Sequence, residues 1–147
     1  MISIVLISFP LFMGARYGKL SVAGNTQPAF ALVCLAAVAE QEETKVHIID
    51  AAAEGLTIEE VFKEVMEIRP DIVGISSMTD GVVSSGKLAM MIKNALPETI
   101  TVIGGCHVTA IPEDTLSEFP GFDLAVIGEG EATFREIIRS VRTKKCT

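Results

Sequence analysis

Runs of β-branched and other apolar residues mark the strands of a sheet. The first, residues 2–7, consists almost entirely of Ile, Val and Leu, which is typical of a strand covered on both faces. Similar runs occupy 46–49 and 71–76, a fourth leads into two glycines at 101–105, and a fifth spans 122–127. The hydrophobic pattern therefore predicts five strands.

Segments with helical spacing of apolar residues lie between these runs. Thr57 and Glu60 have the spacing of a capping box in front of one of them,. The predicted helices are 28–40, one that starts at the capping box and ends before Pro70, 84–94, a short one from Pro112, and 131–142. Strict alternation of strand and helix predicts a three-layer α/β domain. We expect a doubly wound, five-stranded parallel sheet with the flavodoxin-like order 2-1-3-4-5.

Small or hydroxylated residues follow four of the five predicted strands: Ser8, Ser76-Ser77, Gly104-Gly105 and Gly128. The carboxyl ends of parallel strands meet at the edge where ligands bind in open α/β sheets. Glycines leave room and free N–H groups there, and hydroxyls donate hydrogen bonds. The pattern predicts a ligand site, although glycine and serine are also common in such turns without a ligand.

The connection after the first strand, residues 9–27, exceeds the usual length of such loops and is expected to cover the ligand,. Two glycine-containing segments match the known nucleotide-binding motifs only poorly. Gly14 to Leu20 has the wrong spacing for a phosphate loop, and Gly128 to Thr133 matches only half of a dinucleotide fingerprint,.

Composition and charge narrow the function. The 147 residues are 49% hydrophobic, which suits one domain spanning 1–147,. A net charge of −7 argues against nucleic acid as a partner,. The apolar start is too short to span a membrane. Three well-separated cysteines, Cys34, Cys106 and Cys146, predict neither a disulfide framework nor a metal site, so a cytoplasmic location is expected,.

Few side chains are candidates for chemistry. His107, close to Thr109 beyond the fourth strand, could contact a ligand or stabilise its loop, whereas His47 lies inside a predicted strand and is expected to be structural. Asp50 and Glu129 could contact a ligand or be solvated carboxylates. The sequence shows no nucleophile–base pair, no paired catalytic carboxylates and no metal-ligand cluster. We therefore do not expect this chain to catalyse a reaction alone.

Five ordered stretches cover nearly the whole chain after the first loop. They are Pro28–Glu40 (PAFALVCLAAVAE), Val46–Ala51 (VHIIDA), Pro70–Thr79 (PDIVGISSMT), Val102–Pro112 (VIGGCHVTAIP) and Asp123–Phe134 (DLAVIGEGEATF). The set resembles the cobalamin-binding domain at the amino end of cobalamin-dependent radical S-adenosylmethionine enzymes. These enzymes include methyltransferases and the anaerobic magnesium-protoporphyrin IX monomethyl ester cyclase.

The resemblance implies that cobalamin binds with its dimethylbenzimidazole tail along the carboxyl edge of the sheet. It assigns cofactor contacts to Ser76, Ser77, Thr79, Gly104, Gly105, His107, Thr109, Gly128, Glu129 and Gly130. The two glycines of the fourth strand would let the tail pass against the backbone. A valine at Gly105 is therefore expected to block binding and to leave the fold largely intact.

Two departures from the family pattern matter. The Asp-x-His-x-x-Gly motif that supplies a histidine to cobalt is absent after the first strand, where the chain reads Ser8 to Gly14. This favours base-off cobalamin without a protein histidine ligand. The Cys-x-x-x-Cys-x-x-Cys motif for an iron–sulfur cluster is also absent. We expect the chain to be a fragment whose missing radical domain holds the cluster and S-adenosylmethionine. The alternative is a free-standing regulatory or carrier domain for a nucleotide-like ligand.

Overall fold

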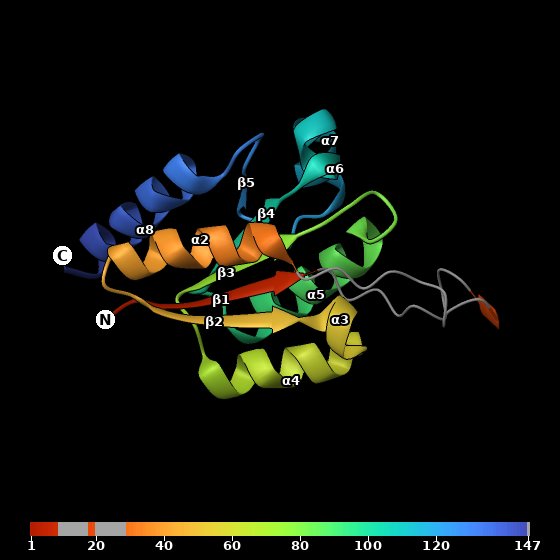
Figure 1. Ribbon diagram of the computed structural model, residues 1–147, viewed down its shortest axis with the longest axis horizontal. Helices are drawn as coiled ribbons and strands as arrows, with labels where there is room; N and C mark the ends of the chain where they lie inside the picture. The colour runs from red at the N-terminus through yellow and green to blue at the C-terminus, as the bar shows by residue number, and fades with distance from the viewer. Residues whose placement is uncertain (9–17, 20–28, 147) are drawn as a thin grey trace.

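The computed structural model describes residues 1–8, 18–19 and 29–146, which form a parallel sheet between two layers of helices (Figure 1). The strands are β1 (Ser3–Ser8), β2 (Lys45–Asp50), β3 (Ile72–Ser76), β4 (Ile100–Gly104) and β5 (Leu124–Ala125). Their order in the sheet is β2-β1-β3-β4-β5, and every neighbouring pair is parallel. The expected flavodoxin-like topology is confirmed.

Helices cover both faces of this sheet. One face carries α2 (Phe30–Gln41) and α8 (Glu131–Cys146), and the other carries α4 (Ile58–Ile68) and α5 (Val82–Ala95). The predicted capping box starts α4: the Thr57 hydroxyl accepts from Glu60 N at 3.2 Å, and Glu60 Oε2 accepts from Thr57 N at 2.8 Å. Among the described residues, no helix combines the length and apolar character needed to cross a membrane.

The core lies in two layers because successive side chains of a strand point to opposite faces. In β1, Ile4 and Leu6 pack under α2 and α8, whereas Val5 and Ile7 pack against α4 and α5. All four are fully buried. Because both faces of β1 are covered by helices, its sequence is a continuous apolar run and not an alternation of apolar and polar residues.

The prediction of one helix per connection is wrong in two places within the described ranges. The helix α3 (Ala51–Glu54) precedes α4, and α6 (Cys106–Ala110) precedes α7 (Pro112–Glu118). Helices of four and five residues are too short to show a hydrophobic period, so the sequence pattern missed them. His107 and Thr109 consequently lie on a helix and not in a loop.

Two predicted boundaries also differ. The helix expected over 84–94 already begins at Val82, and Ser85 is buried inside it. The last strand is only two residues long. The proposed start of the first helix at Pro28, and nearly all of the long connection at 9–27, lie outside the described residues.

Asp123 fixes the start of the short last strand. Its Oδ2 accepts hydrogen bonds from Lys93 Nζ at 2.7 Å and from Thr101 N at 2.9 Å. Burial raises the pKa of Asp123, but the hydrogen bonds from Lys93 and Thr101 together outweigh burial and hold the pKa below its ordinary value. The carboxylate is therefore charged at neutral pH and ties β5 to β4 and α5.

Candidate functional site

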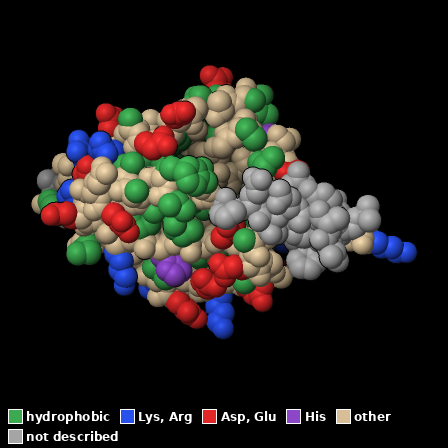
Figure 2. Space-filling model, viewed as in Figure 1, with side chains coloured by type: hydrophobic (Ala, Val, Ile, Leu, Met, Phe, Trp, Pro, Cys, Tyr) green, Lys and Arg blue, Asp and Glu red, His purple; other side chains and the backbone are tan. Residues whose placement is uncertain are grey.

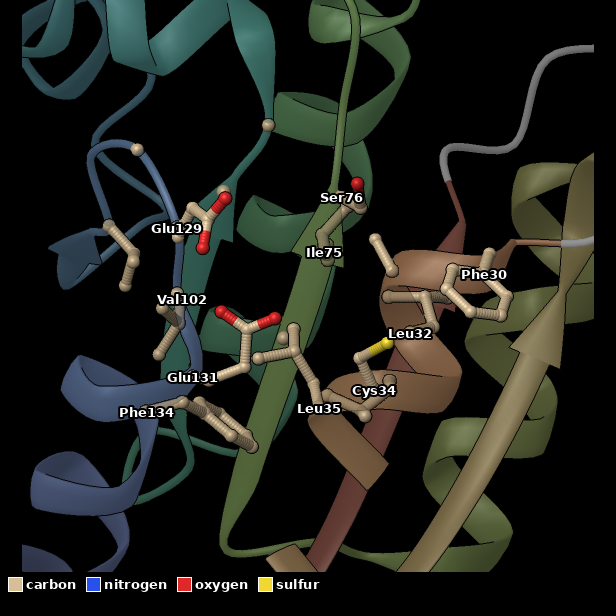
Figure 3. A pocket seen from close by; sticks show the side chains of 18 residues that line it. Phe30, Leu32, Cys34, Leu35, Ile75, Ser76, Val102, Glu129, Glu131 and Phe134 are labelled. Carbon is tan, nitrogen blue, oxygen red and sulfur yellow. The ribbon is translucent and has the colours of Figure 1, made fainter. Parts of the chain in front are cut away.

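A cavity of about 410 Å³ lies between α2 and α8 at the carboxyl edge of the sheet (Figure 3). Its floor includes Leu6, Gly74 and Val102, which are paired in register across β1, β3 and β4. A Cβ atom at Gly74 would lie 2.9 Å from Leu6 Cδ2. Gly74 therefore leaves room for the Leu6 side chain, which packs over it in the floor.

The walls come from the two helices. Phe30, Cys34 and Leu35 project from α2, and Glu131 and Phe134 project from α8 (Figure 3). Apolar side chains also gather on the outer surface over α2 (Figure 2), where Phe30 is 74% exposed. The contribution of α2 to the site was not predicted. The available signal was that this helix is apolar nearly all round, which is unusual for a helix with one solvated face.

An ionic cluster holds the two helices together at the end remote from the cavity. Glu42, directly after α2, accepts from Arg139 Nη2 at 2.7 Å and lies 3.5 Å from Arg135 Nε and 3.7 Å from Arg142 Nη1, all three on α8. The hydrogen bond from Arg139 is the main reason that the pKa of Glu42 is lowered, and burial opposes it only in part. The helices are thus fixed at one end and separated by the cavity at the other.

Gly104 and Gly105 have different roles although they are adjacent. A Cβ atom at Gly104 would meet no atom of the described part of the chain within 4 Å, and this residue lines the cavity. Gly105 has a φ of 110°, and its Cβ would collide with the carbonyl oxygen of Ser77 and lie 3.1 Å from Ser77 N. The expectation that a valine at Gly105 leaves the fold intact is therefore wrong, because that glycine is required by the backbone.

The Gly128-Glu129-Gly130 loop forms the opposite side of the cavity mouth. Thr109 joins this loop to the β4 glycines, because its hydroxyl donates to Gly105 O at 2.8 Å and accepts from Gly128 N at 3.0 Å. Thr109 itself does not line the cavity. Its position indicates that it sets the distance between the two glycine loops.

The Thr109→Val variant is expected to be less stable by about 1–2 kcal/mol, because it leaves two backbone groups without their hydroxyl partner. Thermal denaturation followed by circular dichroism measures this loss. Thr109→Ser keeps the hydroxyl and serves as the matched control. Equal melting temperatures for Thr109→Val and Thr109→Ser would show that the hydroxyl does not hold the loops together.

Six of the ten residues predicted as cofactor contacts line the cavity: Ser76, Gly104, Gly105, Gly128, Glu129 and Gly130. Ser77 is buried, and its hydroxyl donates to Met78 O at 3.0 Å and accepts from Ser85 Oγ at 3.1 Å. Thr79 Oγ1 and His107 Nδ1 lie 3.2 Å apart outside the cavity lining. The structure thus brings together the glycines and Ser76, and separates the other four residues from the cavity.

Asp50, a candidate either for ligand contact or for a solvated carboxylate, does not line the cavity and makes structural hydrogen bonds. Its carboxylate accepts from Ser8 Oγ at 2.8 Å, from Ala29 N at 3.3 Å and from Ala53 N at 3.2 Å. These bonds join the end of β1, the start of α2 and the start of α3. His47 also lies away from the cavity, with Nε2 3.9 Å from Glu64 Oε2 on α4. Within the described ranges, no cluster of three or more His, Cys, Asp or Glu residues could hold a metal ion.

Comparison with known families identifies this arrangement. The family model of the B12 binding domain matches residues 19–138, which include every strand after β1 and every wall of the cavity. The chain belongs to the B12-binding domain family. The resemblance stated from the five sequence stretches is confirmed.

This B12-binding domain is related to parts of longer enzymes. It is 41% identical over 117 residues to an uncharacterized methyltransferase of Pyrococcus horikoshii, PH0819, covering 80% of this chain and 25% of the relative. It is 29% identical over 133 residues to the anaerobic magnesium-protoporphyrin IX monomethyl ester cyclase of Rubrivivax gelatinosus, covering 89% of this chain and 24% of that enzyme. The chain therefore spans about a quarter of the length of these curated relatives.

A solved structure shares the fold of this B12-binding domain. The cobalamin-dependent S-adenosylmethionine radical enzyme OxsB, determined with aqua-cobalamin and S-adenosylmethionine bound, superposes with a TM-score of 0.76 at 21% identity. The match covers 97% of this chain and 19% of OxsB.

Proposed function

We propose that this B12-binding domain is the cofactor module of a longer cobalamin-dependent radical S-adenosylmethionine enzyme, a methyltransferase or a cyclase. In this proposal the nucleotide tail of cobalamin occupies the cavity between α2 and α8. The observation that carries it is an apolar cavity at the carboxyl edge of the sheet, onto which Gly104 opens without a side chain. The named methyltransferase and cyclase relatives support the choice of parent enzyme.

The size and lining of the cavity suit the tail and not the whole cofactor. Small-molecule sites have volumes of about 300–1,000 Å³, and this cavity, at about 410 Å³, lies near the lower limit. Leu6, Val102 and Phe134 offer apolar contacts to an aromatic base,. The larger corrin ring would remain outside, above the carboxyl ends of the strands.

The residues of this chain would bind and orient the cofactor. The bound cobalamin supplies the cobalt-centred transfer chemistry. Ser76 offers a hydroxyl at the cavity mouth, and the Gly104 and Gly128 loops allow close approach of the backbone,. The proposed iron–sulfur cluster and S-adenosylmethionine sites belong to the rest of the parent enzyme.

A tail in the cavity implies base-off cobalamin, because the base is then held away from cobalt. No protein histidine is expected to replace it. The sequence contains two histidines and no Asp-x-His-x-x-Gly motif after β1. His47 lies on the α4 side of the sheet near Glu64, and His107 lies beside Thr79. We therefore propose a base-off state without a histidine ligand.

The test is to mix the purified chain with hydroxocobalamin, remove free cofactor by gel filtration and record the visible spectrum. We expect retained corrin absorbance. Electron paramagnetic resonance of the reduced complex should show no nitrogen splitting from an axial ligand. His107→Ala should reduce affinity by no more than about 1–2 kcal/mol and leave both spectra unchanged. A lack of retained corrin would reject the proposal, and a changed cobalt spectrum in His107→Ala would reject the histidine-free state.

A further inference from the structure

One carboxylate points into the otherwise apolar cavity. Glu131, the first residue of α8, is half-buried and lines the cavity. Figure 3 shows its carboxylate directed into the open space, on the same side as Glu129 at the mouth. Among the described residues, none forms a hydrogen bond or an ion pair with the Glu131 carboxylate. The other hydrogen-bonding side chains of the lining, apart from the Cys34 thiol, are Ser76 and Glu129.

The helix start alone does not account for this orientation. The positive end of the α8 dipole favours a negative charge in the first turn. That effect is also available to a side chain that points into solvent, where water would satisfy its oxygens. A half-buried carboxylate in a mostly apolar cavity gives up part of its hydration,. It regains this free energy when a ligand in the cavity donates a hydrogen bond to it.

We infer that Glu131 accepts a hydrogen bond from the nucleoside part of the corrinoid tail and thereby selects corrinoids whose tail carries a donor. This inference rests on the proposed function. Two groups of the tail can supply the donor: a ribose hydroxyl, or the ring N–H of a protonated benzimidazole, whose nitrogen is free when it does not bind cobalt. The anionic phosphodiester lies away from Glu131, because like charges repel.

Binding measurements with and without the tail test the inference. Hydroxocobalamin and diaquacobinamide, which lacks the nucleotide tail, are titrated into the wild-type chain, Glu131→Leu and Glu131→Gln. For cobalamin we expect Glu131→Leu to bind about 10- to 100-fold more weakly, and the isosteric Glu131→Gln to show a smaller loss. Affinity for cobinamide should be unchanged in both variants. Glu136→Gln removes the same charge from an exposed position of α8 and should bind both corrinoids as the wild type does.

Calorimetry in two buffers of different ionisation enthalpy distinguishes the two donors. Uptake of about one proton per cobalamin by the wild type, absent in Glu131→Gln, identifies the ring N–H. Loss of affinity without proton uptake identifies the ribose hydroxyl. Unchanged cobalamin affinity in Glu131→Leu and Glu131→Gln overturns the inference, and so does an equal loss for cobalamin and cobinamide. If the wild-type chain retains neither corrinoid, the proposed function fails together with the inference.

Discussion

The Gly104→Val variant is expected to fold as the wild type does and to bind cobalamin about 10- to 100-fold more weakly. A Cβ at this position meets no atom of the described residues within 4 Å, so the part of the chain that the structure describes accepts a side chain there. The valine would instead occupy space that the tail needs, and overpacking of this kind costs about 1–3 kcal/mol. Equilibrium titration with hydroxocobalamin measures the loss, and circular dichroism monitors the fold.

The control for this variant lies outside the cavity. Ala95→Val places the same side chain on an exposed position at the end of α5, on the opposite face of the sheet. It should bind cobalamin with wild-type affinity. Wild-type affinity in Gly104→Val would exclude the cavity between α2 and α8 as the site of the tail, whether or not the chain binds cobalamin elsewhere.

The Gly105→Ala variant is expected to lose about 3 kcal/mol or more of its free energy of unfolding. Its φ of 110° is strained for any residue with a side chain,. The added methyl group would also collide with the Ser77 carbonyl, which is backbone and cannot rotate away. For a chain of this length the melting temperature should fall by roughly 10 °C.

Gly104→Ala is the matched comparison, because it adds the same methyl group one residue earlier in the chain. It should melt close to the wild type. If Gly105→Ala were as stable as Gly104→Ala, the close approach of Gly105 to Ser77 could not be a constraint on the fold. Cobalamin affinity is not the readout in this pair, since a variant that loses its local structure also loses its site.

The same glycine pair shows what the sequence can and cannot predict. The β-branched run ending in Gly104-Gly105 correctly predicted a strand that stops at the carboxyl edge of the sheet, where the cavity lies. It could not show which glycine faces open space, because that depends on the position of Ser77 on a different strand connection. Gly74 gave a further signal, since a glycine inside a strand often marks close approach of another group.

The helices were predictable in proportion to their length. The capping box of Thr57 and Glu60 correctly located the start of α4. The five residues of α6 contain too few turns to show a period, so the sequence indicated only that His107 and Thr109 follow the fourth strand. The cavity wall formed by Phe30, Cys34 and Leu35 was also missed, because an apolar helix does not reveal which of its sides faces the sheet and which faces a ligand.

The residues that line the cavity link cofactor binding to the stability of the fold. Leu6, Val102 and Phe134 belong to the hydrophobic cluster between the sheet and the α2–α8 layer, and the same residues line the cavity. A tail that fills the cavity would add apolar contacts to these buried side chains. The cofactor would then act as a removable part of the hydrophobic core, so loading and folding stability would rise together.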